Sequence, residues 1–110
     1  MKTVVALGHD GMGRGDADLG HAILGTFLRK ANAIKGLQAI VLFNGGVRLA
    51  TNDSPVIAEL NQLHEAGVDI LPCGTCIDHF GLGEKMAVGA VSNMDAIIAT
   101  LDGAEKVITL

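Results

Sequence analysis

The sequence predicts a three-layer α/β/α domain built on a five-stranded, doubly wound parallel sheet with the flavodoxin-like arrangement. Short apolar runs alternate along the chain with longer segments in which apolar residues recur at helical spacing. The short runs contain few polar residues, which is typical of strands in a sheet that helices cover on both faces. The resulting order, β-α-β-α-β-α-β-α-β, with right-handed crossovers, takes in residues 1–110 as a single domain.

The first two expected strands enclose a long amphipathic helix. Thr3–Leu7 is apolar and rich in β-branched residues, which is the pattern of a buried strand. The next helix is predicted to begin near Asp16 and Asp18, because the helix dipole favours negative charge at that end. Gly36 ends this helical pattern, and Gln38–Phe43 then predicts a second buried strand.

A shorter strand lies between two further helices. Ser54 and Pro55 predict the start of the second helix, with the serine as its N-cap and the proline at its first position. Gly67 stops that helix, and Val68–Leu71 predicts a third strand. A brief helix is expected over Thr75–Phe80.

The last part of the chain is expected to complete the sheet. Met86–Val91 is an apolar run of strand length between turn-rich segments, so it predicts a fourth strand. Ser92–Asp95 is a variant of the capping box and opens a helix that Gly103 ends. Val107–Leu110 is expected to form the fifth strand.

Composition excludes several classes of protein. Of the 110 residues, 49% are hydrophobic and 18% are charged, which is incompatible with an intrinsically disordered chain. No apolar run is long enough for a transmembrane helix, and the first residues lack the pattern of a signal peptide. The net charge of −4 and the scarcity of aromatic residues argue against nucleic-acid binding. Two cysteines are too few for a disulfide-stapled secreted fold, so we expect a cytoplasmic protein without nucleic-acid or membrane partners.

The combination of high apolar content and low charge also bears on assembly. A small domain of this composition commonly covers part of its surface with copies of itself. We therefore expect a homo-oligomer.

Three irregular, glycine-containing segments follow the first three expected strands, namely Gly8–Gly15, Asn44–Gly46 and Cys73–Cys76. The carboxyl ends of parallel strands share one edge of the sheet, where ligands bind. Glycine there lets backbone N–H groups approach a bound group closely. The first segment does not match the dinucleotide motif, because Asp16 stands where that motif has its third glycine. The residues expected to form a pocket at this edge are Asp10, Gly11, Met12, Gly13, Arg14, Asn44, Gly45, Gly74 and Asn93.

Cys73 is the strongest candidate for a chemically active residue. It follows a strand and stands at the expected start of a helix, where backbone N–H groups and the helix dipole stabilise a thiolate. A thiolate at this edge of the sheet could act as a nucleophile or as a carrier of sulfur. The ordinary alternative is a buried, inert cysteine.

Cys76 completes a Cys-Gly-Thr-Cys motif, which supports two more hypotheses. The C-x-x-C spacing favours a dithiol redox module. Cys73, Cys76 and His79 could also form part of a zinc site with His9, but no second C-x-x-C supports this. We expect no metal and no cofactor. A non-catalytic oligomer that binds a small ligand, with incidental cysteines, is a further hypothesis.

On these motifs, the chain resembles the DsrE/DsrF-like sulfur-relay family. It is most similar to the DsrE-like domain of YedF-type proteins, which are associated with selenium metabolism. The resemblance runs in family order through nearly the whole chain. The matching stretches are Asp10–Asp16, Phe43–Thr51, Val68–Cys76 and Ala87–Met94.

The resemblance implies a five-stranded parallel sheet between helices and assembly as homotrimers or homohexamers. In sulfur-relay members, one cysteine that precedes a glycine by eight residues accepts sulfur as a persulfide, and Cys73 and Gly81 match that pair. Cys76 has a counterpart in the YedF-like branch. The sequence contains no TusA-like domain, so the resemblance implies sulfur donor and acceptor proteins in trans, such as a TusA-like protein. It thus implies a sulfurtransferase-like carrier of sulfur or selenium, with Cys73 and Cys76 as the catalytic residues.

Overall fold

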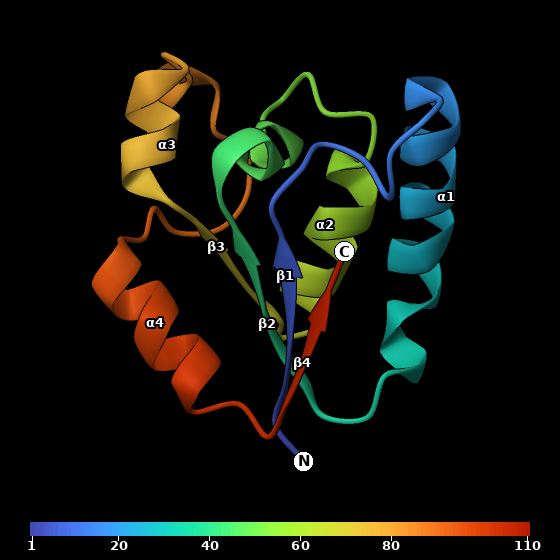
Figure 1. Cartoon of the computed structure of the whole chain (residues 1–110), viewed down its shortest axis with the longest axis vertical. Helices are drawn as coiled ribbons and strands as arrows, with labels where there is room; N and C mark the ends of the chain where they lie inside the picture. The colour runs from blue at the N-terminus through green and yellow to red at the C-terminus, as the bar shows by residue number, and fades with distance from the viewer.

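The computed structural model describes residues 1–110 and has a parallel α/β fold with four strands rather than five (Figure 1). The strands are β1 (Thr3–Leu7), β2 (Leu37–Leu42), β3 (Asp69–Pro72) and β4 (Lys106–Thr109). They lie in the order β3-β2-β1-β4, and every neighbouring pair is parallel. In the flavodoxin-like order β1 would lie between β2 and β3, whereas here it lies between β2 and β4, so that part of the prediction is wrong.

Helices flank the sheet, and α1 and α4 lie on opposite sides of it (Figure 1). The α-helices are α1 (Ala17–Lys30), α2 (Ile57–Glu65), α3 (Gly74–His79) and α4 (Met94–Asp102). The 3₁₀ helices are η1 (Ala31–Ala33), η2 (Asn44–Ala50) and η3 (Gly83–Lys85). None of these helices combines the length and the apolar character needed to cross a lipid bilayer.

The expected fourth strand, Met86–Val91, is absent, and its glycine explains why. Gly89 has φ +82°, whereas residues in a β-strand have negative φ. A Cβ at this position would collide with the carbonyl oxygen of Ile70. The segment still follows the outer edge of β3, because the N–H of Ala90 donates to the Ile70 carbonyl at 3.1 Å. It is therefore an irregular border of the sheet rather than a fifth strand.

Two of the expected helix starts are confirmed by their N-caps. Asp16 accepts a hydrogen bond from the N–H of Leu19, and Asn93 accepts one from the N–H of Ala96, each at 2.8 Å. Each cap thus satisfies one N–H group that has no partner within the helix.

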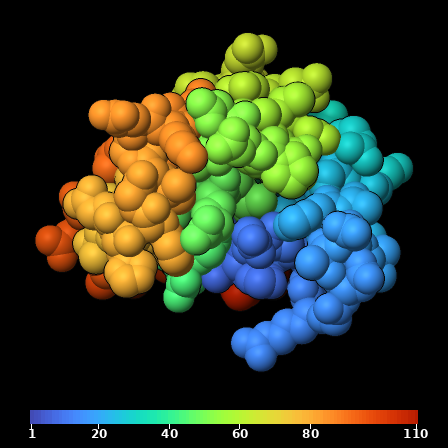
Figure 2. All heavy atoms as spheres, turned by 90° about the horizontal axis from the view of Figure 1, so that it is seen from above, coloured from blue at the N-terminus to red at the C-terminus, as the bar shows by residue number.

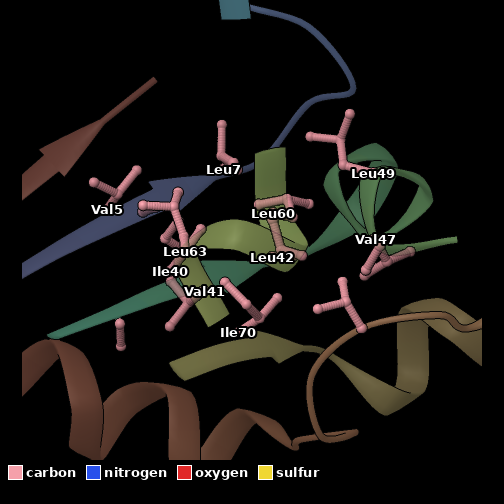
Figure 3. Packing of buried hydrophobic residues seen from close by; sticks show 14 of the residues in the cluster. Val5, Leu7, Ile40, Val41, Leu42, Val47, Leu49, Leu60, Leu63 and Ile70 are labelled. Carbon is pink, nitrogen blue, oxygen red and sulfur yellow. The ribbon is translucent and has the colours of Figure 1, made fainter. Parts of the chain in front are cut away.

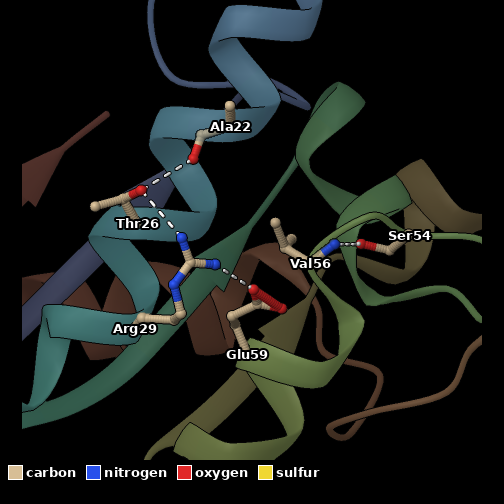
Figure 4. Close-up of polar contacts among 6 residues, drawn as sticks. All are labelled: Ala22, Thr26, Arg29, Ser54, Val56 and Glu59. Carbon is tan, nitrogen blue, oxygen red and sulfur yellow. Dashed lines mark hydrogen bonds and ion pairs between the residues drawn. The ribbon is translucent and has the colours of Figure 1, made fainter.

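The start of α2 differs from the prediction by two residues. The hydroxyl of Ser54 accepts a hydrogen bond of 3.1 Å from the N–H of Val56, so Ser54 and Pro55 form a turn before the helix (Figure 4). The helix then begins at Ile57, with Val56 as its N-cap.

The core lies between the sheet and its helices. Leu7 of β1, Ile40 and Leu42 of β2, and Leu60 of α2 belong to one cluster of buried apolar side chains (Figure 3). Burial of each such side chain contributes roughly 1.5–3 kcal/mol. On the outside, Arg29 of α1 pairs with Glu59 of α2 at 2.9 Å (Figure 4). The strands and helices thus form a packed base for the loops at the carboxyl edge of the sheet.

Candidate functional site

The segments that follow β1, β2 and β3 meet at the carboxyl edge of the sheet, as the sequence predicts. A Cβ on Gly45 would lie 3.6 Å from the backbone nitrogen of Asp10, so the second segment touches the first. The N–H of Asn44 donates to the sulfur of Cys76 at 3.1 Å, so the second segment also touches the third. Figure 2 shows this edge from above: residues 40–50, in green, lie between the blue first loop and residues 70–89, in yellow to orange.

Gly46 allows η2 to cross the end of β1 at very short range. A Cβ at this position would collide with the carbonyl oxygen of Leu7, so no other residue fits without movement of the backbone. This close crossing places Asn44 and Gly45 directly over the ends of β1 and β2.

The two cysteines occupy different positions at the start of α3. Cys73 is the N-cap residue, with extended backbone angles, and it is 1% exposed. The segment before α4 runs beside it, because the N–H of Gly74 donates to the carbonyl of Ser92 at 2.8 Å. Cys76 lies one turn further into α3 and is partly exposed. Both thiols are free.

The pKa values of the two thiols move in opposite directions. Burial raises the pKa of Cys73, but hydrogen bonds from the Cys76 backbone, the Cys76 thiol and Thr75 outweigh burial and lower it. Burial also raises the pKa of Cys76, the N–H of Asn44 partly offsets this, and the Cys73 thiolate raises it further. Cys73 is therefore the more acidic of the two thiols.

A cavity of about 750 Å³ lies beside the thiol pair at this edge. Of the residues predicted for a pocket, it is lined by Gly11, Gly13, Arg14, Asn44 and Gly45. Asn44 connects it to the thiols, because its backbone N–H contacts Cys76. The cavity and the cysteines are thus neighbours with one shared residue.

Four other residues predicted for the pocket lie elsewhere. Asp10 borders a separate hollow of about 240 Å³. Met12 packs against the core, Gly74 contacts Ser92, and the side chain of Asn93 caps α4. Hence Asp10, Met12, Gly74 and Asn93 do not line the main cavity.

Eight further residues line the cavity. Gly8, His9 and Gly15 belong to the first segment expected at this edge, whereas Asp16, Ala17, Phe43, Thr109 and Leu110 were not expected there. Thr109 and Leu110 follow from the same rule as the other loops, because β4 also ends at this edge. His9 lines the cavity, and its Nδ1 lies 3.4 Å from Oδ1 of Asp10.

The structure assembles no metal-ligand cluster around the cysteines. No three His, Cys, Asp or Glu side chains are grouped in a way that could hold an ion, so His9 and His79 do not join Cys73 and Cys76. His79 instead packs edge-on against the ring of Phe80. Arg14 is not among the groups that shift the pKa of either thiol.

Comparisons with known proteins agree with this architecture. The sequence profile described as the DsrE/DsrF-like family matches residues 15–110. The ychN protein from E. coli superposes with a TM-score of 0.72 at 17% identity, over 100% of both chains. The protein of unknown function MTH1491 from Methanobacterium thermoautotrophicum superposes with a TM-score of 0.71 at 17% identity. The superposition covers 99% of this chain and 98% of that protein. The conserved protein of unknown function BT1422 from Bacteroides thetaiotaomicron superposes with a TM-score of 0.67 at 20% identity. The superposition covers 99% of this chain and 95% of that protein. No curated protein matches the sequence significantly.

Proposed function

Because this chain belongs to the DsrE/DsrF-like family, we propose that it handles sulfur, accepting it as a persulfide on Cys73 and passing it on. The observation that carries the proposal is the environment of Cys73 at the carboxyl edge of the sheet. Its sulfur receives hydrogen bonds from Thr75 and Cys76, and these lower its pKa despite burial. A thiolate is the nucleophilic form of cysteine, so the lowered pKa favours sulfur transfer by Cys73.

The overall reaction exchanges one sulfur atom between two thiols. A donor persulfide gives its outer sulfur to Cys73, and the donor leaves as a thiol. An acceptor thiolate then attacks the outer sulfur of the Cys73 persulfide, and the Cys73 thiolate is the leaving group. The N–H groups at the start of α3 stabilise that thiolate, so they assist release. Selenium can replace sulfur in the same steps.

Donor and acceptor act in trans in this proposal, and a TusA-like protein is a candidate for either role. The 750 Å³ cavity offers them a binding surface beside Cys76, with Arg14 at its border. The free thiols fit a reducing compartment, and we place the protein in the cytoplasm.

We also propose that the chain assembles as a homotrimer or homohexamer. Several large apolar side chains are exposed on two helices, namely Leu19 and Ile23 on α1, and Met94 and Ile98 on α4. Contact with further copies would remove them from water.

A dithiol redox role is the second candidate, and the positions of the two thiols favour it. Cys73 is the N-cap residue of α3 and Cys76 lies within its first turn, and both thiols are free. A C-x-x-C pair of this kind can cycle between dithiol and disulfide.

Intact-mass spectrometry after incubation with glutathione persulfide tests the proposal. The expected product is the chain with the mass of one added sulfur. Once loading has reached equilibrium, fragmentation in the mass spectrometer should place that sulfur on Cys73. Loss of the mass of two hydrogens, without any sulfur adduct, would instead identify a dithiol redox module. An unchanged mass would leave only a non-catalytic binding role and overturn the proposal.

A further inference from the structure

The more acidic thiol, Cys73, is the less accessible of the two. Cys73 is 1% exposed, whereas Cys76 is partly exposed at the edge of the sheet. Sulfur exchange requires the attacking sulfur to meet the donor persulfide directly, so the rate depends on access to the thiol as well as on its ionisation. A donor on another protein therefore meets Cys76 before it can meet Cys73.

We infer that Cys76 is the entry point for sulfur, and that sulfur passes from Cys76 to Cys73 within the chain. This inference rests on the proposed sulfur-handling function and adds a second catalytic residue to it. Its basis is geometric: a buried thiol at the N-cap of α3 and a partly exposed thiol within the first turn of the same helix.

Two exchange steps describe the route. First, the Cys76 thiolate attacks the outer sulfur of a donor persulfide, and the donor leaves as a thiolate that takes up the proton lost by Cys76. Second, the Cys73 thiolate attacks the outer sulfur of the Cys76 persulfide, and Cys76 leaves as a thiolate. Cys76 regains the proton that Cys73 gave up. Each step forms one S–S bond and breaks one, so no oxidant or reductant is needed.

The surroundings of each sulfur suit these roles. The N–H of Asn44 lies 3.1 Å from the Cys76 sulfur, so it can stabilise the thiolate that forms and departs there. Burial raises the pKa of Cys73, but hydrogen bonds from the backbone of Cys76 and from Thr75 lower it, which favours Cys73 as the second nucleophile. The first step is then set by access and the second by the acidity of Cys73.

Burial of the final persulfide has a chemical consequence. Persulfides react readily with any thiol that reaches them, and a carrier loses its sulfur if it is exposed to small cytoplasmic thiols. Sulfur held on Cys73 is covered by the protein, and the reverse transfer to Cys76 returns it to the surface. Small thiols should therefore unload the wild-type protein more slowly than a variant that holds sulfur on Cys76 alone.

The test compares loading by glutathione persulfide in Cys76→Ser and Cys73→Ser, each of which keeps a single thiol. We expect Cys73→Ser to gain one sulfur at close to the wild-type rate, and Cys76→Ser to load at least about tenfold more slowly. In urea that unfolds the chain, both variants should load at the same rate, because burial is lost. Rapid quenching of the wild type should show sulfur first on Cys76 and later on Cys73, which requires no substitution.

Three results would overturn the inference. If Cys76→Ser loads as fast as wild type, sulfur reaches Cys73 directly, and the proposed function stands without the relay. If the rate difference persists in urea, it comes from the sequence around each thiol and not from burial. If the wild type takes up no sulfur at all, the proposed function fails together with the relay.

Discussion

The backbone N–H of Asn44 donates a hydrogen bond of 3.1 Å to the sulfur of Cys76, and Asn44 has a left-handed backbone conformation with φ +51°. No other residue besides glycine has a positive φ in this protein. Asparagine tolerates this conformation better than most residues, but it still costs energy. The strained backbone of Asn44 thus holds an N–H donor against the sulfur of Cys76, the proposed entry thiol. Backbone strain of this kind is concentrated at functional sites.

The first prediction concerns this backbone conformation. Asn44→Val should destabilise the protein by about 1–2 kcal/mol, because a β-branched residue is strained at positive φ. Asn44→Gly is the matched control and should be close to wild type, since glycine adopts this conformation freely. Urea unfolding followed by far-UV circular dichroism measures both variants. Equal stability of the valine and glycine variants would mean that the turn is not under strain.

The second prediction concerns the mutual effect of the thiols. Cys76→Ala should raise the pKa of Cys73, because it removes the thiol donor that lowers this pKa. Cys73→Ala should lower the pKa of Cys76, because it removes the hydrogen bond and the negative charge that raise it. Alkylation rates against pH, resolved by site in the wild type, give the reference midpoints. Midpoints that shift in the same direction in both variants would contradict the proposed contact.

The local parts of the fold could be predicted from the sequence, because their causes are local. Thr3–Leu7 is observed as β1 with the predicted bounds, and α1 and α4 begin within the segments that were expected to open them. The strand order could not be predicted in the same way. Whether β1 pairs with β3 or β4 depends on contacts between segments far apart in the chain, and apolar periodicity does not report these.

The candidate site shows the same division. Parallel strands bring their carboxyl ends together, so the meeting of Arg14 with Asn44 around one cavity follows from the fold class. The burial of Cys73 does not, because it involves the distant Ser92, which was expected only to open the last helix and whose backbone pairs with the chain on both sides of Cys73. The role of Asn93 was also mistaken, because its side chain is engaged in capping α4.

The third prediction concerns the segment that borders β3. Gly89→Ala should destabilise the protein by roughly 1–3 kcal/mol, since φ is +82° and the new Cβ would collide with the Ile70 carbonyl. Gly83→Ala is the matched control, because open space surrounds Gly83 and its φ is not positive. Thermal unfolding compares the two. The segment also leads to Ser92, whose backbone pairs beside the buried Cys73, so Gly89→Ala should speed alkylation of Cys73. An unchanged rate would show that the burial of Cys73 does not depend on Gly89.

The fourth prediction concerns assembly through α4. Met94 and Ile98 are 49% and 57% exposed, and they lie four residues apart on one face of the helix. If copies of the chain meet on this face, Ile98→Glu should shift the protein to smaller species, because a buried carboxylate without a partner is strongly unfavourable. Ala96→Glu adds the same charge on the opposite side of the same helix, so it should leave assembly unchanged.

Sedimentation velocity with interference optics measures both variants, since the chain has no tryptophan or tyrosine for absorbance detection. The wild type is expected to sediment as a trimer or hexamer at micromolar concentration. A wild type that sediments as a monomer would remove the proposed assembly altogether. An Ile98→Glu variant that keeps the wild-type sedimentation coefficient would show that copies do not meet on this face of α4. The interface would then be expected at Leu19 and Ile23 on α1, the other exposed apolar pair at helical spacing.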